Sequence, residues 1–141
     1  MVDAQTKAEL WTALSAEASR RGLFELPTPS NSSRVGVRAG DGVTWAFHHR
    51  AQAIRVGILS RDTETSNADD AIALVKQMQN RIESDIGLSI TFDLPRDGSP
   101  SGRAYVEINS FDSHNKDTWP VAINSAVEAM GVFIRHLEGK F

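Results

Sequence analysis

Alternate positions of several extended segments carry side chains that could bind a ligand or a partner. Arg34, Arg38, His48 and Arg55 alternate with apolar residues, and Tyr105 does so later in the chain. Successive side chains of a strand point to opposite faces of a sheet, so we expect these five to share one polar face. Arginine and tyrosine are enriched in binding surfaces. The pattern predicts a surface for a protein or nucleic-acid partner, with an ordinary solvated sheet face as the alternative.

Two carboxylates on neighbouring predicted strands, Asp93 and Glu107, are the candidate metal ligands. A metal-dependent hydrolase needs at least two carboxylates that converge on a divalent cation. These two are the one such pair that the neighbouring strands offer. A divergent metal-dependent nuclease or hydrolase is therefore an alternative function, and it requires both side chains to meet in a cleft.

No established catalytic motif is present, so we assign no catalytic residue and expect no cofactor. Residues 53–59 read AIRVGIL, without the acid and lysine of the (D/E)xK motif of restriction-endonuclease-like nucleases. Gly36, Gly40 and Gly42 fall within a predicted hairpin rather than between a strand and a helix, which excludes a phosphate-binding glycine loop. The sequence favours a binding protein over an enzyme.

The adjacent histidines and the three tryptophans are expected to have structural roles rather than to bind a metal ion or a ligand. His48 and His49 point to opposite faces if they lie on a strand, so they cannot hold one metal ion together. We expect His48 at the surface and His49 at the start of a turn. Trp11, Trp45 and Trp119 lie on apolar stripes or at the start of a helix, so we expect them to pack in the core rather than form a ligand cage.

Hydrophobic periodicity predicts a single α+β domain over residues 1–141 with the element order αβββαββα. Thr6 and Glu9 have capping-box spacing for the first helix, and Thr65 or Ser66 could cap the second. We expect a largely antiparallel five-stranded sheet with the helices packed on one face. The expected helices span 3–21, 67–85 and 119–137, and the expected strands span 34–38, 43–48, 54–59, 88–92 and 104–109.

Composition narrows the class of protein further. The chain has 141 residues, no cysteine and a net charge of −3. The absence of cysteine excludes disulfides and thiolate zinc sites. The negative net charge argues against strong, sequence-independent attraction to nucleic acid. With no long apolar run and a polar amino terminus, we expect a cytoplasmic protein without a membrane partner; a structural homodimer subunit is a further alternative.

Several segments resemble a known family. They are residues 10–14 (LWTAL), 55–59 (RVGIL), 82–87 (IESDIG), 88–92 (LSITF) and 117–120 (DTWP). They resemble the uncharacterised bacterial domain that often follows a restriction-endonuclease-like nuclease domain and also occurs alone. The resemblance implies an accessory role in DNA restriction or phage defence. It implies no catalytic residues, and where that family often carries an acid this chain has Gly57.

Overall fold

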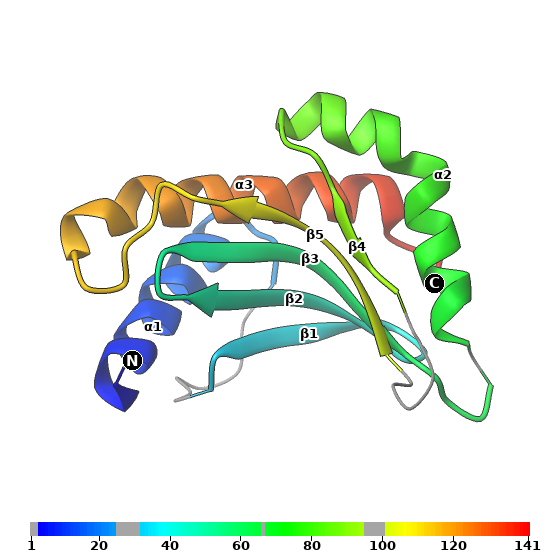
Figure 1. The fold of residues 1–141 in the computed structure, drawn as a ribbon, viewed down its shortest axis with the longest axis horizontal. Helices are drawn as coiled ribbons and strands as arrows, with labels where there is room; N and C mark the ends of the chain where they lie inside the picture. The colour runs from blue at the N-terminus through cyan, green and yellow to red at the C-terminus, as the bar shows by residue number, and fades with distance from the viewer. Residues whose placement is uncertain (1–2, 25–31, 66, 95–100) are drawn as a thin grey trace.

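The computed structural model describes residues 3–24, 32–65, 67–94 and 101–141, and these form an α+β domain (Figure 1). The predicted order of helices and strands is confirmed, with a short 3₁₀ helix, η1, added before the last helix. The elements are α1 (Ala4–Arg20), β1 (Arg34–Gly40), β2 (Val43–Arg50), β3 (Ala53–Arg61), α2 (Ala68–Ile86), β4 (Thr91–Asp93), β5 (Ser101–Ile108), η1 (Lys116–Thr118) and α3 (Trp119–Leu137).

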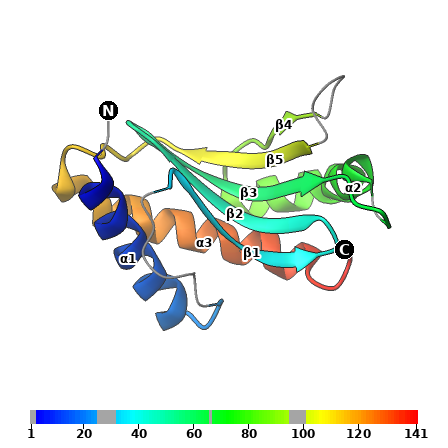
Figure 2. The same cartoon turned by 90° about the horizontal axis from the view of Figure 1, so that it is seen from below.

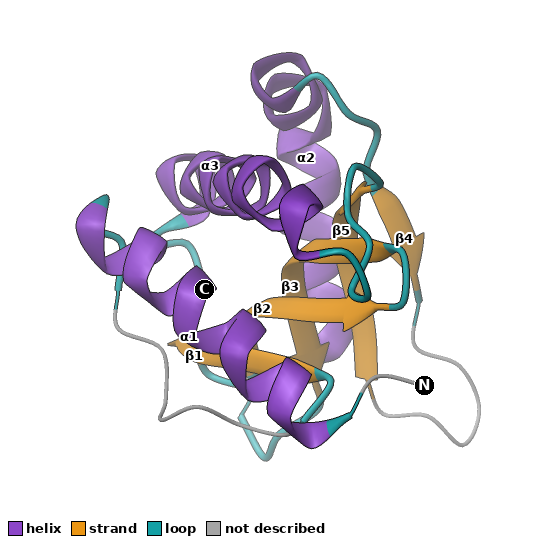
Figure 3. Cartoon of the chain, turned by 90° about the vertical axis from the view of Figure 1, so that its left-hand side faces the viewer, coloured by secondary structure: helices purple, strands orange, loops and turns teal. Residues whose placement is uncertain are grey.

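The strands form one antiparallel sheet in the order β1-β2-β3-β5-β4. Strands β1 to β3 are the expected meander, and β5 pairs with β3 in the centre while β4 is the edge strand. All three helices lie on one side of the sheet, which the side view in Figure 3 shows. Seen from below in Figure 2, α3 runs beneath the strands. The other side of the sheet faces the viewer in Figure 1.

Helix α3 is the centre of the hydrophobic core. It packs against β3 and β5, and both α1 and α2 pack against it. Met130 and Phe133 of α3 are fully buried, as are Val56 of β3 and Val106 of β5. Burying one such side chain contributes about 1.5–3 kcal/mol. This packing fixes which face of each strand points inward.

The helix caps differ in detail from those expected. The side chain of Asp3, rather than Thr6, accepts a hydrogen bond at the start of α1, from the backbone N–H of Thr6 itself at 2.7 Å. Asn67 caps α2, because its side chain accepts from the N–H of Asp69. Thr65 does not cap this helix, and Ser66 lies outside the described residues. In both cases the capping residue directly precedes the first helical residue, a position from which its side-chain oxygen reaches the unpaired N–H groups of the first turn.

The expected strand over 88–92 forms only from Thr91 onward. Gly87 ends α2 with a φ of 83°, a conformation that favours glycine. The Glu83 carboxylate then accepts a hydrogen bond from the N–H of Ile90 at 2.7 Å. This bond ties residues 88–90 to the end of α2 instead of β5, and Leu88 is 39% exposed instead of inward-facing.

His49 is a core residue and does not begin a turn. Strand β2 continues to Arg50, so alternation places His49 on the inward face, where it is 4% exposed. Its ring centroid lies 5.4 Å from that of Trp11, which joins α1 to the sheet. Neither ring nitrogen has a hydrogen-bond partner among the described residues. The expected core packing of Trp11, Trp45 and Trp119 is confirmed.

Gly57 permits a close approach of β3 and β5. A Cβ atom at this position would lie 2.0 Å from the carbonyl oxygen of Ala104 and 2.8 Å from the Cα of Tyr105. Both are backbone atoms of the central strand pair, so they cannot move aside as a flexible side chain could. Glycine is therefore required here for packing of the sheet itself.

Substituting Gly57→Ala should lower the free energy of unfolding by about 2 kcal/mol or more, because the β5 backbone must shift to admit the methyl group. Gly131→Ala in α3 is the matched control. Its added Cβ meets only the Leu23 side chain, at an ordinary 3.8 Å. Because alanine is the better helix former, this control should gain about 0.5–1 kcal/mol. Urea unfolding measures both, and equal effects of the two variants would contradict this explanation.

Candidate functional site: the outer face of the sheet

The outer face of the sheet, opposite the helices, collects the arginines that alternate with the core residues. The register places Arg34 beside His48, His48 beside Arg55, and Gly57 beside Tyr105. Arg38 has the same strand parity as Arg34 and is exposed. The structure thus brings the five expected binding residues onto the same face.

Cross-strand pairing arranges the middle of this face in three rows. We name them the His48 row, the glycine row and the Leu59 row. The His48 row is Arg34, His48, Arg55 and Glu107; the glycine row is Gly36, Ala46, Gly57, Tyr105 and Thr91; the Leu59 row is Arg38, Thr44, Leu59, Arg103 and Asp93. Four residues along a strand separate the two outer rows, which is about 13 Å. The two charged rows therefore border a middle row of mostly small residues.

Positive charge dominates the outward positions of the strands. They hold six arginines and two carboxylates, a surplus of +4 in a chain whose net charge is −3. We call these outward positions the basic face. Its arginines are Arg34, Arg38, Arg50, Arg55, Arg61 and Arg103.

Both carboxylates of the basic face are paired with arginines and lie apart from each other. Glu107 accepts a hydrogen bond from Arg55 Nε at 3.0 Å, and an Asp93 oxygen lies 3.6 Å from Arg103. Asp93 lies opposite Arg103, four residues from Glu107 along β5, so the two acids are about 13 Å apart along the strand direction. The candidate metal ligands therefore do not converge. No group of three or more histidines or acids in the described ranges is placed to hold a metal ion.

Tyr105 and Arg55 form a stacked pair at the centre of the face. The guanidinium carbon of Arg55 lies 4.7 Å from the centroid of the Tyr105 ring. Arg55 is held there by its bond to Glu107, with 22% of its side chain exposed. A guanidinium over an aromatic face is a favourable cation–π arrangement. The two planar groups are consequently fixed in place before any ligand arrives.

The pKa of the His48 ring is lowered, chiefly because the ring is partly buried. Partial burial is the largest cause of a pKa lowered from 6.5 to about 4. The remaining causes are the positive charges of Arg103, Arg55, Arg50 and Arg34. The His48 ring is therefore neutral at pH 7, and its Nδ1 has no hydrogen-bond partner among the described residues.

The hollow at the centre of the face is too small for an organic ligand. Its volume is about 20 Å³, and it is bounded by Arg34, Ala46, His48, Arg55, Gly57, Ile58, Leu59, Arg103 and Tyr105. That volume is room for about one water molecule. A partner that contacts the centre of the face must therefore lie across its surface rather than inside a pocket.

A family model described as a domain of unknown function (DUF4268) matches residues 6–138. The chain belongs to this family. The match covers α1 through α3, so the whole described sheet and its basic face lie within the DUF4268 domain. No curated protein and no solved structure matches the chain.

Three arginines of the DUF4268 basic face were missed by sequence reasoning. Arg103 directly precedes the expected strand 104–109, but β5 begins at Ser101 and pairs Arg103 with Leu59 and Asp93. Arg50 and Arg61 are the last residues of β2 and β3, which extend beyond the expected strands. If the alternating pattern of these two strands is continued by two residues beyond their expected ends, it places Arg50 and Arg61 on the outer face.

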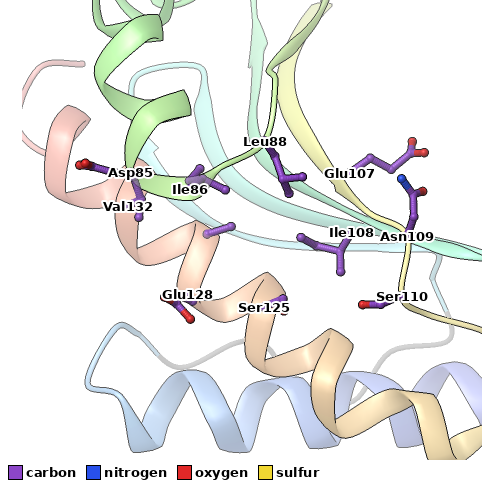
Figure 4. A pocket seen from close by; sticks show the side chains of 11 residues that line it. Asp85, Ile86, Leu88, Glu107, Ile108, Asn109, Ser110, Ser125, Glu128 and Val132 are labelled. Carbon is purple, nitrogen blue, oxygen red and sulfur yellow. The ribbon is translucent and has the colours of Figure 1, made fainter.

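A second hollow, of about 370 Å³, lies between the end of α2, the end of β5 and α3 (Figure 4). Apolar and polar residues both line it, and Figure 4 shows the carboxylates of Asp85 and Glu107 pointing away from it. Asp85 contacts His136 at 2.7 Å and Arg135 at 3.2 Å. Since Glu107 is paired as well, two of the acids at this hollow are already neutralised by the domain itself.

The described helices include none that is long and apolar enough to cross a membrane.

Large apolar side chains with high exposure do not form one patch in the described part of the chain. They are Leu88, Leu94 and Val121, which belong to different segments. The apolar stripe of α3 is buried.

Acidification should destabilise the fold through His48 and His49. Burial is the largest cause of the lowered pKa of both, and His48 falls from 6.5 to about 4. Between those values the unfolded chain binds more protons than the folded one. The contribution of the neutral histidine to the free energy of unfolding is therefore fully present above pH 6.5 and is lost as the pH falls toward 4. Denaturant unfolding at about pH 7.5 and about pH 5 measures this, and His49→Phe should reduce the difference.

His114→Gln, in an exposed loop, is the control and should keep the wild-type pH dependence. If the His49→Phe variant loses as much stability between these two pH values as the wild type does, His49 does not contribute to the pH dependence and the explanation is wrong.

Proposed function

We propose that this DUF4268 domain is a non-catalytic binding module that holds nucleic acid on its basic face. The surplus of +4 on the sheet face opposite the helices is the observation that carries the proposal. All six of its positive side chains are arginines, whose planar guanidinium groups suit bidentate contacts with phosphate. Phosphate contacts supply most of the affinity of proteins for nucleic acid without regard to sequence.

Four of the six arginines are available for phosphate contacts. Arg55 and Arg103 are paired with acids, whereas the other four have no ion pair with a described residue: Arg34, Arg38, Arg50 and Arg61. Four phosphate contacts correspond to a salt slope of about −2.8 for single strands or about −3.6 for duplex DNA. Binding at about 200 mM salt would then be about 50- to 150-fold weaker than at about 50 mM.

A binding role fits the shape and chemistry of the face better than catalysis does. The central hollow has room for about one water, and the two strand carboxylates are separated and paired. The resemblance to a domain that accompanies restriction-endonuclease-like nucleases suggests the context. We propose that the module assists DNA restriction or phage defence by holding nucleic acid for a catalytic partner.

Replacing Arg34 and Arg38 together by alanine should weaken binding to a labelled oligonucleotide and reduce the salt slope by about 1.4–1.8, because two phosphate contacts are lost. Fluorescence anisotropy at several salt concentrations measures both quantities. Arg81→Ala removes an exposed arginine from α2, in the helix layer, and should change neither. No binding by the wild-type protein, or a double variant with the wild-type slope, would overturn the proposal.

A further inference from the structure

The glycine row gives the basic face a low strip between two charged borders. On β1, β2 and β3 this row consists of Gly36, Ala46 and Gly57, which carry at most one side-chain carbon. The His48 row and the Leu59 row on either side carry long side chains, including Arg34 and Arg38 on β1. The strip crosses the strands; Gly36 and Ala46 are partly exposed in it, whereas Gly57 is buried. A flexible chain could therefore lie close to the sheet with arginines on both sides.

This strip leads to the aromatic ring of Tyr105, the single tyrosine of the chain. Tyr105 pairs with Gly57 in the glycine row. The Arg55 guanidinium stacks on its ring, and Glu107 holds that guanidinium. Unpaired bases bind proteins by stacking on aromatic rings and on guanidinium planes. The strip thus ends at an aromatic ring and a guanidinium group, the two kinds of side chain on which an unpaired base stacks.

The same face is poorly shaped for reading a duplex. The major groove of DNA is about 12 Å wide and admits a helix or a two-stranded ribbon. Five strands spaced by about 4.8 Å make a sheet about 19 Å wide. Helices α1, α2 and α3 all lie on the opposite side, so among the described residues no helix projects from the basic face (Figures 1 and 3).

We infer, on the basis of the proposed function, that the partner is single-stranded nucleic acid. The strand crosses β1, β2 and β3 along the glycine row. One base stacks on the Tyr105–Arg55 pair, and phosphates contact arginines such as Arg34 and Arg38 in the two bordering rows. Because the platform uses ring faces and the arginines use phosphates, both contacts tolerate different base sequences.

Fluorescence anisotropy with matched probes tests the inference. The probes are a mixed-sequence DNA of about 15 nucleotides, the RNA of the same sequence, and the corresponding DNA duplex, each at about 50 mM salt. We expect at least one of the two single strands to bind about 10-fold or more tightly than the duplex. The comparison of DNA with RNA identifies which single strand is preferred, and either preference supports the inference.

Variants at Tyr105 separate stacking from charge. Tyr105→Leu should weaken single-strand binding about 5- to 150-fold, the range that loss of one stacked base produces, and should leave duplex binding unchanged. Tyr105→Phe keeps the ring and should bind like the wild type. Ala46→Leu fills the low strip without removing an arginine and should also weaken single-strand binding. Urea unfolding confirms that each variant is folded before its binding is measured.

The outcomes distinguish this inference from the proposed function. If no probe binds, the proposed function is wrong and the inference falls with it. If the duplex binds as tightly as both single strands, or if Tyr105→Leu and Ala46→Leu both bind single strands like the wild type, the inference is overturned. In that case the salt dependence and the Arg34 and Arg38 variants still decide the proposed function.

Discussion

Burial of one face of the sheet under α3 constrains every side chain on the other face. Val56 of β3 and Val106 of β5 are fully buried on the side of this helix. The residues directly before and after each of them in its strand must therefore point outward. A shift of one residue in any strand would move its arginines into the core, where an unpaired charge is costly. The packing that stabilises the fold therefore also holds the basic face together.

This constraint separates charge across the molecule. The whole chain carries −3 and the basic face +4, so the remaining residues carry −7. A polyanion is attracted to the sheet face and repelled by much of the remaining surface, which orients its approach. The two acids on the face cancel only two of its six positive charges, those of Arg55 and Arg103. The Glu107–Arg55 pair also positions the guanidinium over Tyr105.

Gly57 links the packing of the sheet to the shape of its surface. Its missing side chain allows the β5 backbone to approach, since a Cβ would meet the Ala104 oxygen at 2.0 Å. The same absence leaves the low strip in front of Tyr105. The glycine that strand pairing requires thus also forms part of the low strip on which the proposed mode of binding depends. A substitution at Gly57 would disturb the sheet itself, so Ala46 is the better position at which to alter the strip.

Alternation alone determined which side of the sheet Arg34, His48, Arg55 and Tyr105 occupy, because side-chain direction in a strand has a period of two and is local to the chain. The element order followed from the same periodicities. Only tertiary structure decided which strands are neighbours, and hence that Arg55 meets Glu107 and Tyr105 while Asp93 and Glu107 stay apart. It also decided where pairing ends. The Glu83–Ile90 bond shortened β4, and β5 extended to include Arg103, because both depend on contacts between residues distant from the strand's own pattern.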